Sequence, residues 1–161
     1  MDPLPAELFL CEDAAGTANV TKFGENLTMS MKEKMHTGAL YLPGDREILQ
    51  EQMQRLDRLY DFNMTRPSEL AKRQALLKEM FAEIGEDCYV EPPLYSNFGG
   101  GHVHFGRNIY ANFHLTLVDD THIYVGDYTM FGPNVIVATA GHPILPEPVS
   151  YTHLRAHETV L

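Results

Sequence analysis

Apolar and aromatic residues recur every six positions through the second half of the chain. The positions are Phe105, Ala111, Leu117 and Ile123 and, after a slip of two residues, Val125, Phe131 and Val137. A helix repeats about every 3.6 residues and a half-buried strand about every 2, so neither explains this spacing. A period of six predicts a β-solenoid, in which each step is a short strand plus a turn and three steps close one triangular coil.

The residues between these steps also fit a solenoid. They are Gly106-Arg107-Asn108, Asp119-Asp120, Gly126-Asp127 and Gly132-Pro133-Asn134. All are types that tolerate tight or left-handed backbone. An antiparallel sheet with regular turns is the alternative. The solenoid is the better interpretation because one period holds across seven positions with a single slip.

Two helices are predicted before the solenoid. Asp45 caps the first, which runs to about Phe62. Its apolar stripe consists of Leu49, Met53, Leu56 and Tyr60. The second starts near residues 65–68, and its stripe consists of Leu70, Leu77, Phe81 and Ile84, with Gly85 as the C-terminal cap. Because two short helices cannot bury both stripes alone, we expect them to lie against the first coil and close its open end.

The pattern divides the chain into four regions. They are a poorly ordered extension (1–28), a helical N-terminal region (29–86), an incomplete solenoid (87–148) and a tail (149–161). The tail resembles the translation of a sequencing-library adapter. We therefore predict that the native sequence departs from this one near Pro148. The glycine run Gly99–Gly101 predicts a tight turn with close backbone approach.

Composition excludes several classes of protein. Hydrophobic residues are 44% and charged residues 21%, which is ordinary for a soluble globular chain. The net charge of -10 argues against a nucleic-acid partner, which needs a clustered basic surface. Cys11 and Cys88 are far apart and form no metal or disulfide pattern, so a reducing cytoplasm is expected. No apolar run is long enough for a membrane span, and no signal peptide is recognisable.

Histidines are the main candidates for chemistry. Four of the eight in the chain, His102, His104, His114 and His122, fall in or beside the solenoid, where imidazoles from neighbouring subunits can hold zinc. Their spacing is not a local ligand motif, so we predict no metal site. His142 follows Gly141, where the coil ends, and a histidine held there suits general-base work on a hydroxyl. An exposed loop histidine without a role is the alternative.

Several short motifs resemble a known family when taken in order. They are Val90-Glu91-Pro92-Pro93, Gly106-Arg107-Asn108, Tyr110-Ala111-Asn112-Phe113, Asp119-Asp120, Ile123-Tyr124-Val125-Gly126-Asp127, Gly132-Pro133-Asn134-Val135 and Thr139-Ala140-Gly141-His142-Pro143. In this order they closely resemble the maltose and galactoside O-acetyltransferases, which are hexapeptide-repeat acyltransferases. The resemblance covers about residues 31–147.

The resemblance implies a mainly β fold, a left-handed parallel β-helix preceded by short helices, and a homotrimer with active sites between subunits. It implies direct acetyl transfer from acetyl-CoA to a sugar hydroxyl, without a metal. His142 matches the general base, and Asn112 matches a residue that stabilises the oxyanion. Asp120, Tyr110 and Asn97 match positions at the acceptor sugar.

The coenzyme A contacts are expected in coils beyond this chain, which predicts that the chain by itself is an inactive fragment. A metal-dependent hydratase of the carbonic anhydrase type and a non-catalytic structural solenoid are the alternative functions.

Overall fold

The computed structural model describes residues 11–12, 18–19, 29–142, 155–156 and 159–160. The chain forms two compact units, Met1–Ser30 and Met31–Leu161. In the first unit, strand β1 (Cys11–Glu12) pairs antiparallel with β2 (Ala18–Asn19). The rest of the predicted extension, residues 1–28, lies outside the described residues.

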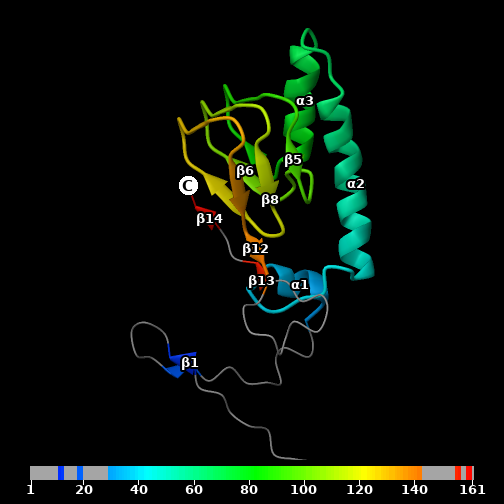
Figure 1. The fold of residues 1–161 in the computed structure, drawn as a ribbon, viewed down its shortest axis with the longest axis vertical. Coiled ribbons are helices and arrows are strands. Elements are labelled where there is room, and N and C mark those ends of the chain that lie inside the picture. Colours follow the sequence, from blue (N-terminus) through cyan, green and yellow to red (C-terminus); the bar gives the residue numbers. More distant parts are fainter. Residues whose placement is uncertain (1–10, 13–17, 20–28, 143–154, 157–158, 161) are drawn as a thin grey trace, which may run out of the picture. The chain divides into compact units, whose positions relative to one another are not determined.

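Three helices precede the strands of the second unit. They are α1 (Met31–Met35), α2 (Arg46–Asn63) and α3 (Leu70–Met80). The predicted cap of α2 is confirmed, because the Asp45 carboxylate accepts a hydrogen bond of 3.0 Å from the backbone N–H of Glu47. Figure 1 shows α2 and α3 side by side along one flank of the strands.

Ten of the strands that the structure describes after α3 form a three-sided coil in which each face is a sheet of parallel strands (Figure 1). One face holds β3 (Glu83–Ile84), β6 (Val103–Phe105), β9 (Ile123–Val125) and β14 (Thr159–Val160). The second holds β4 (Tyr89–Val90), β7 (Tyr110–Ala111) and β10 (Met130–Phe131). The third holds β5 (Tyr95–Ser96), β8 (Thr116–Val118) and β11 (Ile136–Ala138). After them, β12 (Ala140–Gly141) pairs antiparallel with β13 (Arg155–Ala156).

The residues at the predicted six-residue period form the buried interior of this coil. All seven positions, from Phe105 to Val137, are at most 7% exposed. Ile84, Phe105 and Val125 lie in register on one face, and Val90, Ala111 and Phe131 lie in register on the next. The slip of two residues falls within β9, where Ile123 pairs with Val103 and Val125 pairs with Phe105. The sequence pattern therefore predicts the coil correctly.

The predicted stripe of α2 is wrong for three of its four members. Leu49, Met53 and Tyr60 are 44%, 63% and 65% exposed, and only Leu56 packs on the core. The buried face instead carries Ile48, Leu59 and Phe62. Charged side chains share that face, since Glu51 and Arg55 are partly buried there and pair with each other. Because this ion pair places two charged residues on the core-facing side of α2, the hydrophobic pattern of the sequence does not identify that side.

The end of α3 also differs from its prediction. The helix stops at Met80, and Ile84 belongs to the first strand of the coil, β3. Gly85 is not a helix cap. It lets the backbone after β3 lie against the backbone of Gly106, because a Cβ on Gly85 would lie 2.5 Å from the Gly106 carbonyl oxygen. Leu59, Phe62, Leu76, Leu77 and Met80 pack with the coil residues in one cluster. The helices thus lie against the coil, as predicted.

Residues 149–161, the predicted foreign tail, are described only in part. Arg155–Ala156 and Thr159–Val160 form β13 and β14, and β14 pairs in parallel with β9. Residues 149–154, 157–158 and 161 lie outside the described residues, so the origin of the tail stays a prediction. Within the described part of the chain, none of the helices has the length and apolar character required to cross a bilayer.

The stack predicts a large difference between two leucine truncations. Leu117 is fully buried between Ser96 and Val137, so Leu117→Ala is expected to lower the free energy of unfolding by about 3 kcal/mol. Leu49→Ala, on the exposed side of α2, is expected to change it by less than about 0.5 kcal/mol. Urea denaturation measures both values. Equal losses would contradict the assignment of the core.

Candidate functional site

Two consecutive aspartates form the corner between β8 and β9, and both are buried. Asp119 accepts hydrogen bonds from the Ser96 hydroxyl at 2.5 Å and from the backbone N–H groups of Phe98 and Gly100 at 2.9 and 3.0 Å. Burial raises the pKa of the Asp119 carboxyl, and these hydrogen bonds oppose that rise. Asp119 therefore satisfies the backbone of the neighbouring loop and has a structural role.

The loop that Asp119 holds is the predicted glycine turn. Gly99 and Gly100 have φ angles of 61° and 85°, in the left-handed region that glycine adopts without strain. A Cβ on Gly99 would lie 2.5 Å from the Arg55 carbonyl oxygen, and a Cβ on Gly100 would overlap the Phe81 ring. The turn thus approaches both α2 and the end of α3, as the glycine run predicts. It also fixes Asn97, just before it, at the aspartate corner.

Asp120 has different partners from Asp119. Its Oδ1 accepts a hydrogen bond of 2.9 Å from the Asn97 amide, and its Oδ2 accepts one of 2.6 Å from the Tyr41 hydroxyl. The structure thus brings together two of the predicted site residues, Asn97 and Asp120. Burial, followed by the bond to Asp120, raises the pKa of the Tyr41 phenol, which therefore remains a donor.

Sequence reasoning assigned no role to Tyr41. The residue lies between α1 and α2 in a segment without a period, 79 positions from the carboxylate that it contacts. Its ring belongs to a small apolar cluster with Met35, Ile48 and Phe98. No local signal in the sequence identifies such a contact.

His142 is exposed and directly follows β12. Figure 1 shows β12 running from the last coil toward α1. Ala140, two residues before His142, packs against the cluster that contains Tyr41 and Phe98. Two extended residues span about 7 Å, so His142 lies on the side of the coil where the Tyr41 cluster reaches Asp120.

Tyr110 and Asn112 lie at another corner. Tyr110 is in β7 and stacks on Tyr89 with ring centroids 5.9 Å apart. The Asn112 carbonyl accepts a hydrogen bond of 2.8 Å from the backbone N–H of Phe113, which leaves its amide N–H groups to donate. One face of the coil, roughly 20 Å for six residues, separates this corner from Asp120. A single chain therefore does not bring the five predicted residues into one site.

A cluster of histidines lies beside the aspartate corner. The rings of His36, His102 and His122 have centroids 4.8, 5.2 and 5.5 Å apart. His36 Nδ1 is 2.9 Å from the Thr121 hydroxyl oxygen, and His102 Nδ1 is 2.7 Å from the Asp119 carbonyl oxygen. His104 Nε2 is 2.9 Å from His122 Nδ1. Sequence reasoning missed His36 because it comes from the distant helical region.

Two imidazoles of this cluster, His36 and His102, favour the neutral form. Burial, followed by the neighbouring His102 and His122, lowers the pKa of His36 to about 4, and Glu51 partly opposes this shift. Burial also lowers the pKa of His102. Among the residues that the structure describes, no three His, Cys, Asp or Glu side chains are placed to hold a metal ion. His114 lies elsewhere, beside Tyr95 and Asn134.

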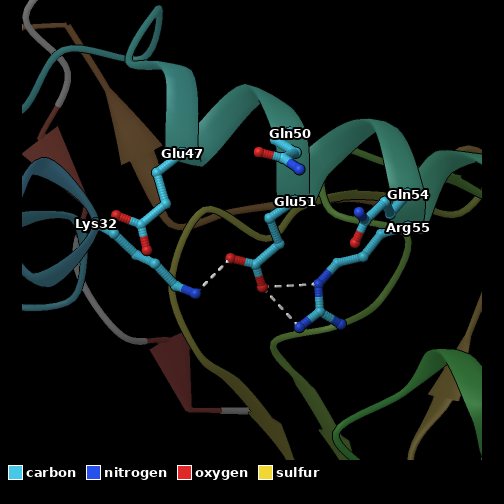
Figure 2. Close-up of a pocket in the computed structure, with 6 residues that line it drawn as sticks. All are labelled: Lys32, Glu47, Gln50, Glu51, Gln54 and Arg55. Atoms are coloured by element: carbon cyan, nitrogen blue, oxygen red, sulfur yellow. Dashed lines mark hydrogen bonds and ion pairs between the residues drawn. The ribbon is translucent and has the colours of Figure 1, made fainter.

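A polar groove of about 380 Å³ runs along α2, and none of the five predicted site residues lines it. Its lining consists of Lys32, Glu47, Gln50, Glu51, Gln54 and Arg55. Figure 2 shows the Glu51 carboxylate between the side chains of Lys32 and Arg55, each at 2.8 Å. Because the lining holds two acidic side chains, Glu47 and Glu51, and two basic ones, the groove presents little net charge.

Comparison with known proteins gives one matching family model and close relatives. Residues 34–85 match the maltose acetyltransferase hexapeptide capping motif. The galactoside O-acetyltransferase of Lactococcus lactis subsp. lactis is 52% identical over 115 residues, which cover 71% of this chain. The chain spans 56% of the length of that relative.

Solved structures show the same fold. A galactoside acetyltransferase in complex with coenzyme A superposes with a TM-score of 0.77 at 37% identity, over 81% of this chain and 65% of that one. A maltose O-acetyltransferase from Clostridium difficile 630 gives a TM-score of 0.78 at 30% identity, over 81% and 69%. The coil is therefore the left-handed β-helix that the motifs imply.

The low pKa of His36 predicts a pH-dependent stability. The folded-state value of about 4 lies below the ordinary 6.5, so the folded chain prefers the neutral ring. The stability that the neutral His36 ring contributes is therefore fully present above about pH 6.5 and is lost as the pH falls toward 4. Thermal unfolding between pH 7 and 4 is expected to show a falling melting temperature, with a weaker fall in His36→Gln.

His114→Gln is the control, because His114 is exposed and lies outside the cluster. It is expected to keep the pH dependence of the wild type. Carboxylates titrate in the lower part of this range in all three proteins, so the difference between variants is the relevant quantity. Identical curves for His36→Gln and the wild type would show that the His36 ring does not resist protonation.

Proposed function

The chain belongs to the family of maltose and galactoside O-acetyltransferases, and we propose that the complete protein transfers an acetyl group from acetyl-CoA to a sugar hydroxyl. The observation that carries this proposal is the corner where Asp120 lies between Asn97 and Tyr41. The Tyr41 cluster also packs against Ala140, two residues before the exposed His142. The names of the relatives support the reaction, since they are galactoside and maltose O-acetyltransferases.

His142 acts as the general base in this proposal. Its imidazole takes the proton from a sugar hydroxyl as the oxygen forms a bond to the thioester carbonyl carbon. The carbon–sulfur bond then breaks, and the imidazolium returns the proton to the departing thiolate. No bond forms between the acetyl group and the protein. An exposed imidazole at the end of a strand is accessible to both substrates.

Asp120 and Asn97 bind the acceptor. A carboxylate offers about four lone-pair positions, and Tyr41 and Asn97 use one at each oxygen of Asp120. The remaining positions accept hydrogen bonds from sugar hydroxyls. Asp119, which is fully buried against the glycine turn, has no such role.

Tyr110 and Asn112 complete the site from a neighbouring subunit. Both belong to a different corner of the coil, so their proposed roles at the sugar and at the oxyanion need a second chain. The amide N–H groups of Asn112 suit an oxyanion, because its carbonyl is already bonded to the backbone. We therefore propose a homotrimer with its active sites between subunits.

Exposed apolar side chains on the outer faces of the coil support this assembly. Met130 and Ile136 are 76% and 69% exposed, on β10 and β11. The exposed side chains of α2, Leu49, Met53 and Tyr60, and its C-cap Met64 add to the unburied apolar area. Burying such surface is the main gain in subunit association.

The thioester donor supplies an activated acetyl group. One of the solved relatives is a complex with coenzyme A. We propose that residues in further coils of the complete protein hold the coenzyme, because the chain spans just over half of the Lactococcus relative. We place the enzyme in the cytoplasm, in keeping with the buried free thiol of Cys88. No observation favours the hydratase or the purely structural solenoid.

Replacing the proposed base tests the reaction. In the complete protein, His142→Ala is expected to lower kcat by about 10²–10⁴-fold, since no other group takes the hydroxyl proton. Thiol release from acetyl-CoA in the presence of a panel of sugars measures it. His114→Gln is the matched control and is expected to retain full activity. A His142→Ala enzyme within threefold of the wild type would refute the assignment.

The proposed assembly is tested by light scattering after size-exclusion chromatography. The complete protein is expected to elute with three times its chain mass. Ile136→Lys places a charge on an exposed apolar face, so it is expected to shift the mass toward that of a monomer. Lys78→Glu, on the exposed side of α3, should leave it unchanged. A wild type that runs as a monomer at micromolar concentration would exclude the trimer.

A further inference from the structure

We infer that Tyr41 is a positioning residue for the acceptor, which sets sugar affinity by fixing the orientation of the Asp120 carboxylate. The inference rests on the proposed function and assigns part of the acceptor site to the helical N-terminal region. Tyr41 acts through Asp120 and is not itself a catalytic residue.

The contact is short and well buried. The Tyr41 side chain is fully buried, and its hydroxyl lies 2.6 Å from Asp120 Oδ2. A hydrogen bond from a hydroxyl to a carboxylate at this distance is among the stronger kinds in proteins. Asn97 donates to the other oxygen at 2.9 Å. Two donors on opposite oxygens fix the plane of the carboxylate, whereas Asn97 alone leaves it free to turn.

Packing explains the ring of Tyr41 but not its hydroxyl. The ring contacts an apolar cluster with Met35, Ile48 and Phe98, which a phenylalanine at position 41 would fill as well. A buried hydroxyl costs free energy unless it is hydrogen-bonded, so the cluster by itself disfavours tyrosine. The hydroxyl is accounted for by Asp120, whose neighbour Asp119 already provides the structural contacts of this corner.

The position of Tyr41 also connects two parts of the protein. The residue lies between α1 and α2, whereas Asp120 lies at the corner between β8 and β9. Ala140 of β12, two residues from His142, packs against the same cluster. The Tyr41 cluster therefore contacts both the strand that leads to the base and the carboxylate that receives the acceptor. A change in this helical region therefore alters acceptor binding through the Asp120 carboxylate.

The test compares the wild type, Tyr41→Phe and Ile48→Val in the complete protein. Tyr41→Phe removes only the hydroxyl, and its acceptor KM is expected to rise about tenfold, the effect of losing one hydrogen bond to a charged group. The KM for acetyl-CoA is expected to stay unchanged, and kcat should change less than the acceptor KM. Ile48→Val trims the same cluster but keeps the Tyr41–Asp120 bond, so it should leave the acceptor KM unchanged.

Two further measurements separate positioning from stability. In an Asp120→Asn background, Tyr41→Phe should cause no additional rise in acceptor KM, because it acts through the carboxylate. The side-chain carboxyl ¹³C resonance of Asp120, recorded by NMR at pH 7, should move in Tyr41→Phe and stay in place in Ile48→Val. This resonance reports the contact whether or not the protein is active.

The outcomes distinguish the inference from the proposed function. An active wild type with an unchanged acceptor KM in Tyr41→Phe overturns the role of Tyr41 and leaves the acetyltransferase intact. A rise of equal size in Ile48→Val shows that cluster packing, and not the hydroxyl, sets the affinity, which also overturns it. A wild type that acetylates no sugar refutes the proposed function and the inference with it, even if the Asp120 resonance still moves.

Discussion

In-register stacking of buried side chains between successive coils is the constraint on which the rest of the structure depends. Ser96, Leu117 and Val137 follow one another at intervals of 21 and 20 residues on one face. On the other two faces, strands β3, β6 and β9 and strands β4, β7 and β10 repeat these intervals. The turns inherit this spacing, since Asp87, Asn108 and Tyr128 all adopt positive φ at equivalent positions. Every corner of the coil, including the one with Asp119 and Asp120, is thereby placed by core packing.

The candidate functional corner lies where this coil meets a second, smaller apolar cluster. Met35, Tyr41, Ile48 and Phe98 form a group separate from the main core. Its members come from α1, from the segment after it, from α2 and from the glycine turn. Because the glycine turn itself depends on Asp119, one buried carboxylate supports the loop that carries Asn97 to its place. Structure and candidate chemistry are thus divided between two adjacent residues.

The sequence predicts the coil well because its determinant is periodic. All seven predicted inward positions are buried, and the glycine turn and the Asp45 cap are found where expected. The face of α2 was not predictable from hydrophobicity, since Arg55 and Glu51 occupy the buried side as an ion pair. The contacts of Tyr41 and His36 were not predictable for a different reason. Their partners, Asp120 and Thr121, are 79 and 85 residues away in the sequence.

Asp119 and Asp120 are adjacent in sequence but have different partners, and this difference limits which sequence changes the corner can accept. Asp119 is committed to the fold, whereas Asp120 faces a side chain from the helical region and an amide from the loop. In the proposed acceptor site, substitution at position 120 or at its partners would therefore change ligand preference without disturbing the hydrogen bonds of Asp119. An insertion or deletion of one residue would exchange the two carboxylates between interior and site, so sequence drift here is confined to replacement at constant length.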